Sequence, residues 1–164
     1  MTGCGAELGG SGARGSDAGG ALVVPDEAQG AVVVRHVDGD TLVLRGTGRG
    51  PLPDAPTRVR LLQVDTPEVG PEPECLGPEA SARLAELLPV GAAVRVAADV
   101  DLLDRYGRTL LLVWDDGGRS AQEVLVGEGL AAVLHVGRND RGLAVLEAAE
   151  QAARADGRGR WGGC

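Results

Sequence analysis

The order of its periodic segments constrains the fold of this chain more than any other feature. Strand-like runs rich in Val, Leu and Thr lie at 31–37, 41–45, 57–64, 93–98 and 109–114. The Asp38-Gly39 pair between the first two runs is a strong hairpin signal. Helical spacing begins at Gly77, at the capping box 120–123 and at Asp140, which we expect to cap a last helix to Ala155. Five strands with a helix after the third predict an α+β fold, a five-stranded Greek-key barrel of the OB type with three helices.

The core of such a barrel has to be built from aliphatic side chains, because the sequence contains two Trp, one Tyr and no Phe. Its 164 residues, of which 43% are hydrophobic, suffice for one domain with a core. We place that domain at residues 31–164. We expect residues 1–30 to form a disordered tether. The first twenty of these residues are rich in Gly, Ala and Ser and show no periodicity.

The net charge of −8 at pH 7 opposes a broad interface with nucleic acid. Proteins that bind long stretches of duplex usually present a basic surface to the phosphates. A local cluster of arginines that binds one phosphate remains compatible with this charge. The sequence has no Cys-x-x-Cys pair, so a zinc site is not predicted.

Three acids and two arginines lie in short polar segments beside the predicted strands. Asp40 follows the hairpin turn, whereas Asp65 and Glu68 follow the third strand. Carboxylate oxygens are the ligands that a hard cation prefers, so these acids could gather around one metal ion. Arg60 and Arg108 could then hold a phosphate, because a guanidinium pairs with two phosphate oxygens. Each residue taken singly has an ordinary explanation in a strand, turn or loop, but the set predicts phosphodiester hydrolysis.

The strings around these residues resemble the staphylococcal nuclease family, whose members fold as OB barrels. They are VDGDT at 37–41, VRLLQVDTPE at 59–68, GPEAS at 77–81, DRYGR at 104–108, VGEGLA at 126–131 and the closing Trp161. The resemblance covers about residues 31–161, nearly the whole predicted domain. An ordered set of this length is specific for the family and less specific for activity, because some family domains keep the fold and lose the site.

The resemblance implies a Ca²⁺ site and a hydrolytic mechanism. Asp40, Asp65 and the carbonyl of Thr66 match the family's Ca²⁺ ligands, and oxygen ligands suit this ion. Glu68 matches the family's candidate general base, which takes a proton from the attacking water. The two arginines named above match the pair that clamps the phosphate and stabilises the charge that develops on it.

The resemblance also implies a nucleotide pocket that departs from the family pattern. Arg105 and Tyr106 match a Lys-Tyr pair that contacts a neighbouring phosphate; packing beside a turn is the alternative role for Tyr106. Two tyrosines of the family's pocket fall at His135 and Gly137, so we expect His135 at the pocket edge and weaker stacking of bases. The loop 69–76 carries two glutamates where the prototype is rich in lysine, which should repel a polynucleotide.

The activity implied by the resemblance is Ca²⁺-dependent hydrolysis of DNA and RNA, with single strands favoured and 3′-phosphates as products. A first alternative is a non-catalytic OB-fold module that binds single strands or a protein partner. The acidic composition favours that alternative, and the complete set of site residues opposes it. A second alternative is a Ca²⁺ site that serves only stability.

The three cysteines bear on the compartment. Cys75 and Cys164 are expected to form a disulfide, because the Gly-Gly pair before Cys164 lets the terminus reach its partner; two free thiols are the alternative. The residues 1–4 resemble the end of a bacterial lipoprotein signal, so Cys4 is a candidate for lipidation, although no apolar stretch precedes it. Otherwise Cys4 is an incidental residue of the tail. A disulfide requires an oxidising compartment, so we expect an exported monomer, either secreted or tethered to a membrane.

Overall fold

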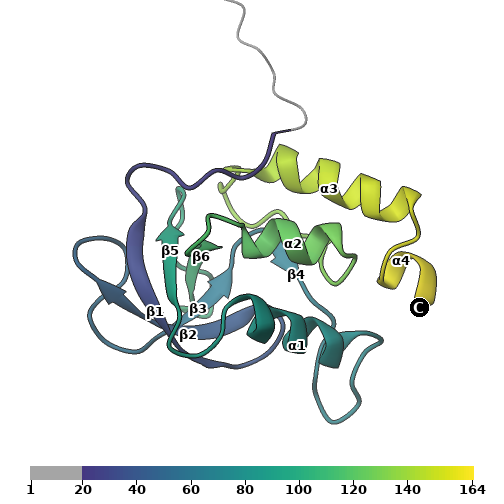
Figure 1. Cartoon of the computed structure of the whole chain (residues 1–164), viewed down its shortest axis with the longest axis horizontal. Helices are drawn as coiled ribbons and strands as arrows, with labels where there is room; N and C mark the ends of the chain where they lie inside the picture. Colours follow the sequence, from purple (N-terminus) through teal and green to yellow (C-terminus); the bar gives the residue numbers. More distant parts are fainter. Residues whose placement is uncertain (1–19) are drawn as a thin grey trace, which may run out of the picture.

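A computed structural model describes residues 20–164, in which five strands close into a barrel (Figure 1). These strands are β1 (Gln29–His36), β2 (Thr41–Thr47), β3 (Thr57–Leu61), β5 (Ala93–Ala97) and β6 (Thr109–Asp115). They follow the order β1-β2-β3-β6-β5 around the barrel, and β5 returns to β1. The pair β3–β6 is parallel and the other pairs are antiparallel. The predicted five-stranded OB barrel is therefore confirmed.

Three longer helices and one final turn of helix accompany the barrel. They are α1 (Gly77–Leu87), α2 (Ala121–Gly127), α3 (Leu143–Ala155) and α4 (Arg160–Gly163). Figure 1 shows α2 between α1 and α3, and α2 contacts both. Half of the predicted capping box forms, because the Ser120 hydroxyl accepts a hydrogen bond from the Glu123 N–H. The Glu123 carboxylate accepts a hydrogen bond from the Leu22 N–H and does not return to Ser120. The class is α+β, as expected.

The predicted cap of the last long helix is wrong. The helix begins at Leu143, and its N-cap is Gly142 in the left-handed conformation, not Asp140. A side chain at position 142 would meet the Leu22 side chain at 2.2 Å, so only glycine fits both the conformation and the contact. A contact between distant segments thus sets this helix start, which local sequence did not indicate.

The core is aliphatic, as the composition requires. Alternate residues of the strands point into the barrel, among them Val33, Leu42, Leu44, Val59, Leu61, Val96, Leu111 and Val113. Helix α1 adds Leu84 and α2 adds Leu125, both fully buried. The outer positions of β3 are left to Arg58 and Arg60, and this alternation directs both arginines away from the core.

The third strand is shorter than predicted. It ends at Leu61, because Gln63 adopts a positive φ of 65° that no strand continues through. The buried Gln63 side chain donates a hydrogen bond of 3.0 Å to the Asn139 carbonyl, which holds it in this conformation. The chain then forms β4 (Val64–Asp65), which pairs with β7 (Ala132–Val133) in a separate two-stranded sheet.

The folded unit begins before residue 31, so the predicted tether is too long at its C-terminal side. Leu22 is buried, and its carbonyl accepts a hydrogen bond of 2.7 Å from the Trp114 indole N–H. Its backbone N–H donates to the Glu123 carboxylate at 2.9 Å. Residues 1–19, including the lipidation candidate Cys4, lie outside the described residues. Over residues 20–164, no helix has the length and apolar character needed to cross a membrane.

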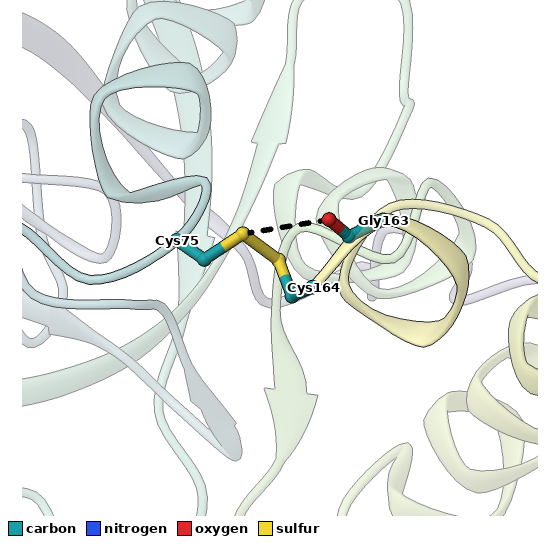
Figure 2. Close-up of a disulfide and its surroundings, with 3 residues drawn as sticks. All are labelled: Cys75, Gly163 and Cys164. Carbon is teal, nitrogen blue, oxygen red and sulfur yellow. Dashed lines mark hydrogen bonds between the residues drawn. A yellow bond between two sulfur atoms is a disulfide. The ribbon is translucent and has the colours of Figure 1, made fainter.

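The end of the chain is fastened to the segment before α1. Figure 2 shows Cys75 bonded to Cys164, and the two Cα atoms are 6.0 Å apart at a sequence separation of 89. Cys164 follows α4 directly, so the bond holds the last turn of helix against the loop that precedes α1. The structure therefore contains the disulfide that the sequence suggested.

We expect the disulfide to stabilise the domain by restricting the unfolded chain. Closing a loop of this length contributes about 4.5 kcal/mol in the chain-entropy description. In a urea titration, the free energy of unfolding of the double variant Cys75→Ser/Cys164→Ser should be lower than that of the wild type by most of this contribution. Equal midpoints for the variant and the oxidised wild type would contradict this expectation.

Candidate active site

Arg60 is the centre of the candidate site, and it is buried. Its register partner on β2 is Thr41, directly after the β1–β2 turn. Its Nη1 group donates to the carbonyls of Leu61, at 2.7 Å, and Val64, at 2.5 Å. Both carbonyls face the guanidinium because the chain turns between β3 and β4. The side chain of Arg60 is only 10% exposed, so these bonds replace most of its hydration.

Two of the predicted carboxylates meet at this guanidinium. Asp40 Oδ1 lies 3.1 Å from Arg60 Nε, and Asp65 Oδ1 accepts a hydrogen bond of 3.0 Å from Arg60 Nη2. The Asp40 side chain is as buried as that of Arg60, whereas the Asp65 side chain is 56% exposed. The structure thus brings together three predicted site residues from three different segments.

The Asp40 carboxylate has partners at both oxygens. Thr41 Oγ1 donates to Oδ1 at 3.1 Å, and the N–H and hydroxyl of Thr66 donate to Oδ2 at 2.9 and 3.0 Å. Burial raises the pKa of Asp40, although the Arg60 charge and the Thr66 donors act in the opposite direction. The ionised carboxylate is therefore held at a cost in solvation, which a further nearby positive charge would reduce.

The turn that carries Asp40 is fixed by close packing. A side chain at Gly39 would lie 2.8 Å from Thr66 Oγ1 and 3.0 Å from the Ala80 Cβ atom in α1. The Asp40 carbonyl also accepts a hydrogen bond of 2.8 Å from the Leu61 N–H. The Asp-Gly sequence of the hairpin therefore serves two purposes, a tight turn and a contact with the segment that carries Thr66.

The oxygens of Asp40 and Asp65 are suitable ligands for a hard cation. Asp40 and Asp65 direct oxygens at one positive group, the Arg60 guanidinium, and two carboxylates suit Ca²⁺. The Asp40 carboxylate accepts three hydrogen bonds and lies against Arg60 Nε, so an ion held by it would share the carboxylate with these groups. Among residues 20–164, no three His, Cys, Asp or Glu side chains converge on a possible ion.

Glu68 does not join the two aspartates, so the predicted gathering of three carboxylates is not formed. Its backbone N–H donates to the Glu74 carboxylate at 3.0 Å, and its carbonyl accepts from the Glu74 N–H at 2.9 Å. A side chain at Gly77 would lie 2.4 Å from the Glu68 carbonyl oxygen. The loop between Glu68 and α1 therefore closes on itself, and the Glu68 side chain remains exposed.

Most of the predicted substrate residues line one hollow beside Arg60. Its volume is about 570 Å³. The predicted residues in its wall are Arg60, Arg105, Tyr106, Arg108 and His135. The structure thus brings together both arginines that were expected to hold the phosphate, with the residues expected to bind the rest of the nucleotide.

Arg108 is positioned by a residue to which sequence analysis gave no role. Asp104 accepts hydrogen bonds at Oδ1 from the N–H groups of Tyr106, at 2.8 Å, and Arg108, at 2.9 Å. Its Oδ2 accepts from Arg108 Nε at 2.7 Å. With this one side chain, Asp104 both closes the turn before β6 and orients the Arg108 guanidinium. The i, i+4 spacing of an acid and an arginine around Tyr-Gly was the available signal.

The rest of the hollow explains one of the two missing tyrosines, the one that falls at Gly137. Gly137 has a φ of +61°, and a side chain there would lie 2.5 Å from the Asp101 carboxylate, so a tyrosine does not fit. Leu103 and Leu134 line the hollow and are 56% and 43% exposed. Sequence analysis missed these leucines because each lies in an irregular segment. They offer aliphatic contact to a base instead of aromatic stacking.

We expect Asp104 to contribute a pH-dependent part of the stability. Burial opposes ionisation, but the hydrogen bonds from Arg108 and Tyr106 outweigh it and lower the pKa of Asp104. A lowered pKa stabilises the fold above the unfolded value of about 3.9, and this contribution is lost as pH falls through the folded pKa. The free energy gap between wild type and Asp104→Asn should narrow from about pH 6 to pH 2 in urea titrations. A gap that stays constant over this range would contradict the assignment.

Comparison with known proteins identifies the family. Residues 58–163 match the family described as "Staphylococcal nuclease homologue". The chain is 36% identical over 131 residues to "Endonuclease YncB" of Bacillus subtilis, which covers 77% of this chain and 59% of that protein. It is 39% identical over 105 residues to "SPbeta prophage-derived endonuclease YokF" of the same organism, covering 62% of this chain and 33% of that protein.

A third relative is covered over more of its length. The chain is 32% identical over 125 residues to "Thermonuclease" of Staphylococcus intermedius, covering 75% of this chain and 70% of that protein. In contrast, the chain spans about three fifths and one third of the two Bacillus proteins. Since the family match covers well over half of the chain, including three of the five barrel strands and helices α1 to α4, the chain belongs to the staphylococcal nuclease family.

Proposed function

We propose that this chain is a Ca²⁺-dependent nuclease that hydrolyses phosphodiester bonds of DNA and RNA, with single strands favoured and 3′-phosphates left. The observation that carries the proposal is the convergence of Arg60 and Arg108 on one hollow beside the buried Asp40 carboxylate. The names of the relatives, endonuclease and thermonuclease, agree with it. The products and the metal are inferred from the family resemblance.

The two arginines have unequal roles in this proposal. Arg60 Nη1 donates to two carbonyls, one N–H of Nη2 donates to Asp65, and Nε lies against Asp40. Within residues 20–164, this leaves the second N–H of Nη2 without a partner. In the part of the chain that the structure describes, Arg108 donates through Nε alone, to Asp104, so its Nη groups can pair with two oxygens of a phosphate. Arg108 is therefore the fork that binds the phosphate, and Arg60 adds a single donor and a fixed charge.

The reaction itself is attack of water on phosphorus. Glu68 accepts a proton from the attacking water, the bond from phosphorus to the 5′ oxygen breaks, and that oxygen takes a proton as the phosphate stays on the 3′ side. The Arg60 and Arg108 charges stabilise the negative charge that builds on the phosphoryl oxygens. Ca²⁺, held by Asp40, Asp65 and the Thr66 carbonyl, would supply polarisation of the phosphate.

The alternative function is a non-catalytic module that binds single strands or a protein partner. The net charge of −8 and the absence of a three-carboxylate cluster within residues 20–164 favour it. The two arginines in one hollow favour the enzyme, because a protein-binding surface does not need a free guanidinium fork beside a buried carboxylate.

Glu68→Gln separates these functions, because the Glu68 side chain is exposed and its loss should leave the fold intact. With Ca²⁺ and heat-denatured DNA, we expect kcat to fall by about 10²- to 10⁴-fold. Glu72→Gln, an exposed acid on the same loop, is the matched control and should keep its activity. The Ca²⁺-induced rise in unfolding temperature should survive in both variants, and EGTA should abolish cleavage by the wild type.

Three results would contradict parts of the proposal. If folded wild type with Ca²⁺ cleaves neither DNA nor RNA, the enzyme proposal fails and the binding module replaces it. If Glu68→Gln cleaves at the wild-type rate, Glu68 is not the base. A Ca²⁺ effect on stability without any cleavage would leave the ion a structural role.

We further propose that the chain works in an oxidising compartment, as a secreted protein or one tethered through Cys4. Support comes from the Cys75–Cys164 bond, because such bonds persist outside the reducing cytosol. Alkylation of thiols immediately on cell lysis, followed by peptide mass analysis, should find Cys75 and Cys164 protected until a reductant is added. Alkylation of both residues without reductant would refute this localisation.

A further inference from the structure

A third arginine faces the same side of the barrel as Arg60. Val59 and Leu61 point into the core and are fully buried, so Arg58 shares the outer face of β3 with Arg60. Arg58 is exposed, whereas Arg60 is buried. Neither the family resemblance nor the proposed mechanism gives Arg58 a role.

The pairing of strands brings Arg58 to Arg108. In the parallel pair of β3 and β6, Val59 is opposite Thr109, so the residues directly before them, Arg58 and Arg108, are neighbours. A second hollow of about 410 Å³ is lined by Arg58, Tyr106, Gly107 and Arg108. Because Arg108 and Tyr106 also line the larger hollow, the two hollows adjoin at these side chains.

One of the two charges in this second hollow, that of Arg58, has no carboxylate partner within the described residues. On this face, Arg60 pairs with Asp40 and Asp65, and Arg108 pairs with Asp104. Within residues 20–164, Arg58 forms no ion pair with a carboxylate, although the chain has 24 acids and 16 basic residues. An unneutralised guanidinium in a hollow of an acidic protein favours an anionic ligand over solvent alone.

We propose that the Arg58 hollow binds a backbone phosphate next to the scissile one, so that the substrate is a polynucleotide strand spanning both hollows. The inference rests on the proposed function. Arg108 holds the scissile phosphate, and Arg58 pairs with the following phosphate along the chain. Tyr106 is 68% exposed and lines both hollows, and the guanidinium carbons of Arg105 and Arg108 lie 4.8 and 5.5 Å from its ring centroid. The tyrosine therefore links these two arginines of the larger hollow to the Arg58 hollow.

The outer face of the barrel offers a continuation of this path. Arg58 is opposite Val43 on β2, and Val43 is opposite Arg35 on β1, so all three share the outer face. Arg35 is exposed and, within residues 20–164, pairs with no carboxylate. For this reason Arg35 cannot serve as a neutral control. Arg49 can, because it is exposed in the turn between β2 and β3 and lines neither hollow.

The test compares Arg58→Ala with Arg49→Ala on two substrates. One is a dinucleotide with only the scissile phosphate, and the other is a single strand of about 12 nucleotides. Arg58→Ala should raise KM for the long strand about threefold to tenfold at low salt, with kcat unchanged. Its kcat/KM for the dinucleotide should equal that of wild type. Arg58→Lys should recover most of the lost KM, and Arg49→Ala should match wild type on both substrates.

Binding measurements keep this inference separate from the proposed function. We would titrate the labelled strand with Glu68→Gln protein and with Glu68→Gln/Arg58→Ala protein over a range of salt concentrations. Removing one phosphate contact should make the slope of log affinity against log salt shallower by about 0.7. Equal slopes for these proteins, or an equal loss in Arg49→Ala, would overturn the inference. Lack of cleavage by wild type together with Arg58-dependent slopes would refute the nuclease proposal and preserve the phosphate site.

Discussion

The buried contact between Arg60 and Asp40 is the interaction on which the rest of the site depends. It joins the end of the β1–β2 turn to an outer position of β3, and Arg60 reaches on to carbonyls on both sides of the turn toward β4. A buried charge without its partner would cost several kcal/mol, about 3–5, so each group holds the other in place. The Arg60 guanidinium also binds Asp65, so both aspartates of the candidate site are positioned around this one side chain.

Because of this contact, Arg60 and Arg108 have different roles in the proposed phosphate site. Arg60 is committed to the protein through most of its donors, whereas Arg108 is oriented by one carboxylate and keeps its fork free. The two roles complement each other in binding a phosphate. The fixed positive charge of Arg60 stabilises the phosphate electrostatically, and the Nη groups of Arg108 can adjust to its oxygens. Asp104 belongs in this description as a positioning residue, since it closes the turn and orients Arg108 through one side chain.

An acidic protein that is proposed to act on a polyanion has to concentrate its positive charge. Here the arginines of β3 and of the turn before β6 meet on the outer face of the barrel, because a parallel strand pair brings them into register. The acids Glu68 and Glu74 lie on a loop that closes on itself beside the disulfide at Cys75. The arginines proposed to bind the strand and the acidic loop that carries the proposed base therefore come from different segments of the chain.

The sequence by itself determined the order of the barrel strands and longer helices, the hairpin at Asp38-Gly39 and the N-cap at Ser120, because these are encoded in local spacing and alternation. It also indicated Arg60 and Arg108, which meet at one hollow, and Asp40 and Asp65, which meet at Arg60. It did not determine the break at Gln63, the start of α3 at Gly142 or the packing of Leu22 on Trp114. Each of these depends on partners from distant segments, Asn139, Leu22 and Glu123 among them. Only the tertiary structure decided which donors Arg60 retains and that Arg58 adjoins Arg108, because strand register and burial set these contacts and local pattern does not.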